Sequence, residues 1–197
     1  MHNPPQQQDS WVRFFVRFRS WMILVLFVLA ISVAWIVGTW LSGGNAQAQP
    51  KAGTQVGFIA PDFALPMLDG QAISLSSQRG NVVLINFWAA WCGPCRAEMP
   101  AINRLYVKYR DAGFTVLAVN ATYQDDEANA RSLVRSLGLT FPVLLDHSGA
   151  TSRTYRLRSL PTSYFVGRDG VIREIMVGSM TEAMLETRIT RLLAGGR

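Results

Sequence analysis

Residues 82–95 read VVLINFWAAWCGPC, and this stretch decides the fold. Its first seven residues are apolar apart from Asn86, which is typical of a strand buried on both faces. Cys92 and Cys95 follow after a short turn, and helix-forming residues come next. A strand that leads into a C-x-x-C motif at a helix start places the first sulfur where unpaired backbone N–H groups favour the thiolate. The pattern therefore predicts a redox-active dithiol.

Cys92 and Cys95 are the only two cysteines among the 197 residues. A thiolate at Cys92 would attack a disulfide, and Cys95, one helical turn further on, would resolve the mixed disulfide. A structural zinc site needs about four nitrogen or sulfur ligands, and the chain adds only His2 and His147 to the cysteines. A purely structural disulfide across so short a loop would constrain little of the unfolded chain. We therefore expect a catalytic pair, with no metal and no cofactor.

A long apolar segment precedes the motif. Residues 22–41 carry no charge and, at ~1.5 Å per residue, match the ~30 Å core of a bilayer. Arginines stand at positions 13, 17 and 19, and no charge follows the segment before Lys51, so the positive-inside rule places the N-terminus in the cytoplasm. Ala46-Gln47-Ala48 has the form of a signal-peptide cleavage site, but the apolar segment is longer than in signal peptides. We expect a retained, single-pass membrane anchor.

These features predict four parts: a cytoplasmic tail (1–20), a transmembrane signal-anchor helix (21–41), a linker (42–54) and a catalytic domain (55–197) on the extracytoplasmic, periplasmic side. Alternating strand and helix patterns in the last part predict an α/β fold with a mixed sheet. The expected strands are 82–88, 114–120, 141–145, 162–167 and 171–177. The expected helices are 93–110, 126–137 and 150–157, with a last helix behind a capping box at Ser179 and Glu182.

The charge distribution excludes one class of partner. The formal net charge is +6, but the domain from Lys51 onward holds 16 basic and 12 acidic residues. It contains no cluster of lysines or arginines with interleaved aromatic residues, which is the pattern typical of nucleic-acid binding. We therefore expect no nucleic-acid partner.

Several motifs resemble those of the TlpA/ResA family of membrane-anchored thiol–disulfide oxidoreductases in the thioredoxin superfamily, and especially its ResA branch. The resemblance covers about residues 55–194 and implies a thioredoxin-like fold with an N-terminal β-hairpin and a central helix–strand insert at about 122–145. The motifs are APDFAL (60–65), LDG (68–70), the WCGPC block followed by Glu98-Met99-Pro100, Leu160-Pro161-Thr162, and GSMTE (178–182).

The resemblance also implies roles for individual residues. Pro161 matches the cis-proline that faces the cysteine pair, and a cis bond would expose the backbone of Leu160 to a substrate chain. Glu98 matches an acid near the active site of the ResA branch. Because Asn86 stands where thioredoxin has a buried aspartate, Glu98 is the nearest candidate for moving the proton of Cys95, unless it is an ordinary solvated glutamate. Residues expected to bind or shield the substrate are Trp91, Gly93, Pro94, Leu160 and Thr162.

ResA-type proteins reduce the haem-attachment cysteines of apocytochrome c and are recharged by a membrane electron donor, so we expect the same partners here. Three alternatives stay open. The protein could be a general dithiol reductase for other disulfide-bearing proteins. It could deliver copper through its soft thiolates, with His147 as the available extra ligand. It could be a peroxiredoxin, since that class shares the A-P-D-F-x-L opening, but Ala89 stands where the class needs a hydroxyl.

Overall fold

The computed structural model describes residues 9–42 and 51–195, and the chain divides into two compact units, Met1–Gln49 and Pro50–Arg197. Among the described residues of the first unit, 9–42 form the helix α1 (Asp9–Ser42), which begins earlier than the predicted span of 21–41. Its segment Trp21–Gly38 has a mean hydropathy of 2.6 and is unburied, so it is long and apolar enough to cross a membrane. The Ala46-Gln47-Ala48 motif and the first eight residues of the predicted tail lie outside the described residues.

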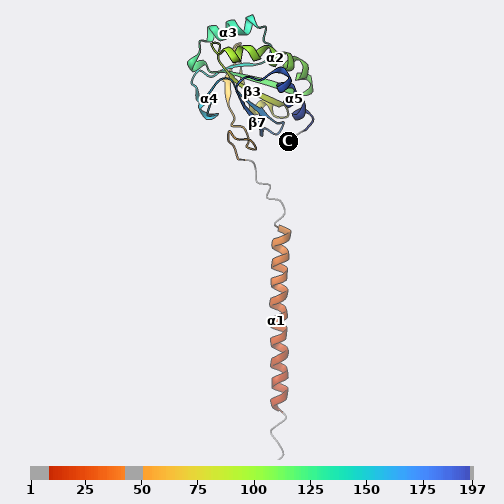
Figure 1. Cartoon of the computed structure of the whole chain (residues 1–197). Helices are drawn as coiled ribbons and strands as arrows, with labels where there is room; N and C mark the ends of the chain where they lie inside the picture. The colour runs from red at the N-terminus through yellow and green to blue at the C-terminus, as the bar shows by residue number, and fades with distance from the viewer. Residues whose placement is uncertain (1–8, 43–50, 196–197) are drawn as a thin grey trace, which may run out of the picture. The chain divides into compact units, whose positions relative to one another are not determined.

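A five-stranded sheet organises the second unit, within the described residues 51–195 (Figure 1). β3 (Val82–Trp88) lies at its centre, parallel to β4 (Phe114–Asn120) and antiparallel to β6 (Thr162–Val166). All seven residues of β3 are buried. β5 pairs parallel with β4, and β7 pairs antiparallel with β6. The mixed sheet predicted from the sequence is thus confirmed. Its strands, in spatial order, are β5 (Val143–Leu145), β4 (Phe114–Asn120), β3 (Val82–Trp88), β6 (Thr162–Val166) and β7 (Ile172–Val177).

Helices cover both faces of this sheet. Because successive strand side chains point to opposite faces, β3 contributes to two apolar cores. Leu84 and Trp88 lie in one core, together with residues of α2 (Gly93–Tyr109) and α5 (Glu182–Leu193). Ile85 and Phe87 lie in the other core, which contains Tyr155. The helices are α2 (Gly93–Tyr109), α3 (Glu127–Ser136), α4 (Ala150–Thr154) and α5 (Glu182–Leu193).

The predicted N-terminal hairpin is present as β1 (Ala64–Pro66) and β2 (Ala72–Ser74), which pair antiparallel. The stretch before it belongs to the domain as well. The N–H of Gly57 donates to the carbonyl of Ile172 at 2.8 Å, and Ala52 bridges to Ile59. Residues 51–54 of the predicted linker are therefore part of the folded unit, while 43–50 lie outside the described residues.

The expected insert is also present, as the short 3-10 helix η3 (Thr122–Gln124) followed by α3 and β5. Some boundaries differ from those predicted. α4 ends at Thr154 rather than at 157, because Arg156 adopts a left-handed conformation with φ of 52° that a helix cannot continue through. The N-cap of α5 is Thr181, whose hydroxyl accepts from the N–H of Met184 at 3.3 Å, and not Ser179.

Candidate active site

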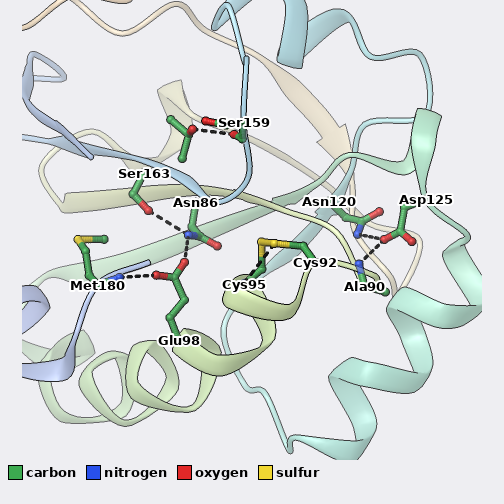
Figure 2. Close-up of a disulfide and its surroundings, with 11 residues drawn as sticks. Asn86, Ala90, Cys92, Cys95, Glu98, Asn120, Asp125, Ser159, Ser163 and Met180 are labelled. Carbon is green, nitrogen blue, oxygen red and sulfur yellow. Dashed lines mark hydrogen bonds between the residues drawn. A yellow bond between two sulfur atoms is a disulfide. The ribbon is translucent and has the colours of Figure 1, made fainter. Parts of the chain in front are cut away.

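Both cysteines lie where β3 leads into α2, and they form a disulfide with an S–S distance of 2.07 Å (Figure 2). Cys92 is the N-cap of α2 and Cys95 lies in its first turn. Cys92 is 4% exposed and Cys95 is fully buried. The N–H of Cys95 donates to Cys92 Sγ at 3.2 Å. A donor aimed at this sulfur from a helix start stabilises a thiolate on Cys92 rather than on Cys95.

The residues around the disulfide form a partly exposed rim. Trp91 is 61% exposed, and its indole Nε1 donates to the carbonyl of Gln124 at 3.1 Å. Gly93 and Pro94, between the cysteines, are exposed. Trp88 is fully buried in the core. Trp91, Gly93 and Pro94 are thus accessible to a partner chain, and their contact with substrate remains a prediction.

The loop before β6 reaches the same end of the sheet. The Leu160–Pro161 peptide bond is cis, as the resemblance implied. Thr162 pairs with Phe87 of β3, which places Pro161 beside the end of the strand that leads to Cys92. The carbonyl of Pro161 accepts from the N–H of Gly178 at 2.8 Å, whereas the backbone of Leu160 has no hydrogen-bond partner among the described residues. Contact between the Leu160 backbone and a substrate chain remains a prediction.

Glu98 is buried, so the alternative of a solvated helix glutamate is wrong. It lies on α2 one turn after Cys95, and each carboxylate oxygen has a donor (Figure 2). Oε1 accepts from Asn86 Nδ2 at 2.9 Å, and Oε2 accepts from the N–H of Met180 at 3.0 Å. Asn86 Nδ2 also donates to the hydroxyl of Ser163 at 2.9 Å. The contributions of Met180 and Ser163 were not predicted from the sequence.

Burial raises the pKa of Glu98 above its ordinary value, because removal from water disfavours the charged carboxylate. The hydrogen bonds from Met180 and Asn86 act in the opposite direction and offset part of this shift. An acid with a raised pKa can hold a proton closer to neutral pH. One helical turn from Cys95, such a group is suited to supply or accept the proton of the resolving thiol.

A cysteine pair at a helix start and a cis-proline beside the end of the strand that leads to it define a thiol–disulfide oxidoreductase of the thioredoxin fold. The AhpC/TSA family matches residues 56–175 of the chain. The chain is 36% identical over 172 residues to the thioredoxin-like protein YneN of Bacillus subtilis, covering 87% of this chain and 97% of that protein. The chain therefore belongs to the AhpC/TSA family, among its ResA-like thiol–disulfide oxidoreductases.

Two further relatives agree with this assignment. The thiol–disulfide oxidoreductase ResA of Geobacillus kaustophilus is 36% identical over 139 residues, which cover 71% of this chain and 79% of that protein. A crystal structure from Chlorobium tepidum, described as a thiol:disulfide interchange protein, DsbE, has a TM-score of 0.63 and 38% identity. It covers 68% of this chain and 94% of its own. The protein is thus a thiol–disulfide oxidoreductase with a Cys92-x-x-Cys95 pair.

Proposed function

We propose that the protein is an extracytoplasmic disulfide reductase and that its substrates are the C-x-x-C-H haem-attachment cysteines of apocytochrome c. One observation carries the proposal. The GSMTE motif, which resembles the ResA branch, supplies the Met180 N–H that holds Glu98 behind the cysteine pair. Two separate parts of the ResA-like sequence pattern therefore meet in one buried unit at the dithiol.

The reaction requires two exchange steps. The Cys92 thiolate attacks one sulfur of the substrate disulfide, which forms a mixed disulfide and releases one substrate thiolate. The Cys95 thiolate then attacks Cys92 Sγ, which forms the Cys92–Cys95 disulfide and releases the second substrate thiolate. Two electrons pass to the substrate, and two protons are taken up by its thiolates. Glu98 accepts the proton that Cys95 loses before the second step.

The proposed location follows from the N-terminal unit. α1 contains one apolar segment long enough to anchor the chain in a membrane, and arginines precede that segment in the sequence. We propose that the N-terminus is cytoplasmic and that the catalytic domain lies on the extracytoplasmic side. A membrane protein that carries reducing equivalents across the bilayer would then return the disulfide to the dithiol.

The direction of the reaction predicts the reduction potential. Gly93-Pro94 is the dipeptide that separates the cysteines of thioredoxin, so we expect a potential nearer ~−270 mV than the ~−120 mV of a strong oxidase. Equilibration of the full-length protein with defined glutathione or dithiothreitol buffers measures this value. A result above about −150 mV would assign the protein to the oxidants instead.

Haem attachment tests the proposed substrate. Cells that lack the protein should show little covalently bound haem in their c-type cytochromes, because the oxidised attachment cysteines cannot react with haem. Expression of the parent chain, or addition of a small dithiol to the medium, should restore the haem-staining bands, and the Cys92→Ala variant should not. Undiminished haem attachment in the deletion strain would contradict the cytochrome proposal. A general dithiol reductase that acts on other disulfide-bearing proteins would then be the remaining alternative.

The other two alternatives gain no support from the site. Ala89, three residues before Cys92, is buried and has no hydroxyl to activate a peroxide-reducing cysteine. His147, the extra ligand expected for copper, lies 3.6 Å from the carboxylate of Glu127 on α3. No contact among the described residues brings it to the sulfurs.

A further inference from the structure

One carboxylate from the insert holds the loop that leads to Cys92. Asp125 lies between η3 and α3, and its Oδ2 accepts from the backbone N–H of Ala90 at 2.6 Å (Figure 2). The same oxygen accepts from Asn120 Nδ2 at 2.7 Å, and Oδ1 accepts from the N–H of Asp126 at 2.9 Å. Three donors from three parts of the chain therefore converge on this one side chain.

Neighbouring hydrogen bonds also stabilise the contact between this loop and the insert. Asn120 is fully buried at the end of β4, and its Oδ1 accepts from the Thr122 hydroxyl at 2.9 Å, which orients the amide so that Nδ2 faces Asp125. The indole of Trp91 donates to the carbonyl of Gln124. The two residues immediately before Cys92 are thus each bonded to the segment that begins the insert.

This arrangement matters because Ala90 lies two residues before the nucleophile. Hydrogen bonds to charged acceptors are the stronger ones, and this one fixes a loop backbone N–H rather than a movable side chain. We propose that Asp125 is a positioning residue: through its bond to Ala90 it fixes the loop of residues 89–92 beside its own carboxylate, and this fixed negative charge sets the dithiol–disulfide equilibrium. The proposal concerns the oxidoreductase reaction itself and holds whichever protein is the substrate.

The expected direction of the effect follows from charge. A carboxylate close to Cys92 opposes the thiolate that appears on reduction, whereas Arg96, which lines the same groove of about 590 Å³ beside the loop, favours it. Asp126 also lines this groove, but its side chain bonds only to the start of α3, through the N–H groups of Ala128 and Asn129. Loss of the Asp125 carboxylate should therefore stabilise the reduced form.

Asp125→Asn tests the proposal in the full-length protein in detergent. The asparagine keeps the shape but removes the negative charge. Its oxygen can take the place of Oδ2 and keep the bonds from Ala90 and Asn120, whereas its amide nitrogen then faces the N–H of Asp126, so that bond is lost. We expect the equilibrium constant with glutathione to shift about tenfold towards the reduced protein, equivalent to ~30 mV. Alkylation of Cys92 by iodoacetamide at pH 7 should accelerate at least about threefold, in line with a larger thiolate fraction.

Asp126→Asn is the matched control, because it removes the same charge one residue away without touching the loop. It should leave both readouts within about twofold of the parent, as expected for an exposed charge. The proposal is overturned if Asp125→Asn also stays within twofold, or if both variants shift equally, since a general charge effect would then suffice. Should Asp125→Asn fail to fold, Asp125→Glu keeps the charge but displaces it, and a parent-like equilibrium constant in that variant would equally overturn the proposal.

Discussion

Cys95→Ala should capture substrate proteins as stable mixed disulfides, whereas Cys92→Ala should capture none. Cys92 is the sulfur at the helix start and the one with residual exposure, so it makes the first attack. Without Cys95 the mixed disulfide has no internal thiol to resolve it. Both variants should lose multiple-turnover reduction of disulfides completely, so the difference between them lies in the covalent complexes.

Non-reducing gels of cells that express each full-length variant would measure this difference, and mass spectrometry would identify the captured proteins. The double variant Cys92→Ala/Cys95→Ala is the control for complexes that involve neither sulfur. Equal capture by the two single variants would contradict the assignment of the nucleophile. A captured set without any C-x-x-C-H protein would contradict the proposed substrate but not the assignment of the two cysteines.

Asn86→Asp should destabilise the domain strongly at neutral pH, by on the order of 3 kcal/mol. The substitution replaces the amide that donates to Glu98 Oε1 at 2.9 Å with a second buried carboxylate. Two carboxylates at that distance cannot both ionise at low cost, and one acceptor loses its donor. Urea unfolding of the oxidised protein, followed by circular dichroism, measures the loss.

Glu98→Gln should rescue this variant, because the new amide at position 98 can donate to the new carboxylate at position 86. The Met180 N–H still has an oxygen to donate to, and the Ser163 hydroxyl can donate to position 86 in place of accepting from it. A double-mutant cycle should therefore give a coupling energy of about 2–3 kcal/mol in favour of the swapped pair, near the upper end for residues in contact. A cycle that closes without coupling would mean that Asn86 and Glu98 do not act as a unit.

Glu98→Gln alone links stability to pH. Burial raises the folded-state pKa of Glu98 above its ordinary value of 4.5. Its contribution to stability is therefore fully present below pH 4.5 and is lost as the pH rises through the raised value. As the pH increases from acid to neutral, the free energy of unfolding of the variant should therefore rise relative to that of the parent. Alkylation of Cys92 should also shift to lower pH, because a nearby negative charge is removed.

The elements around the dithiol could be predicted because each has a local signal. An apolar run, a C-x-x-C turn and helix-forming residues specify β3 and α2 whatever the rest of the chain does. The surroundings of Glu98 had no such signal, since Met180 lies 82 positions away and donates through its backbone, which any residue could do. The role of Asp125 was equally hidden, because its partner at Ala90 is also a backbone N–H.

Backbone hydrogen bonds join residues 51–60, at the beginning of the catalytic domain, to the start of β7. Their hydrogen bonds cover an outer strand edge that would otherwise offer unpaired groups to a second chain. Val166, before the turn into β7, pairs with Val83, so this attachment lies where β3 begins, while Cys92 follows the end of β3. A force that pulls on the N-terminal side of the domain would therefore act on the end of the sheet that lies away from the sulfurs of Cys92 and Cys95. A tether or fusion partner joined just before Lys51 therefore attaches to the domain at the end away from Cys92.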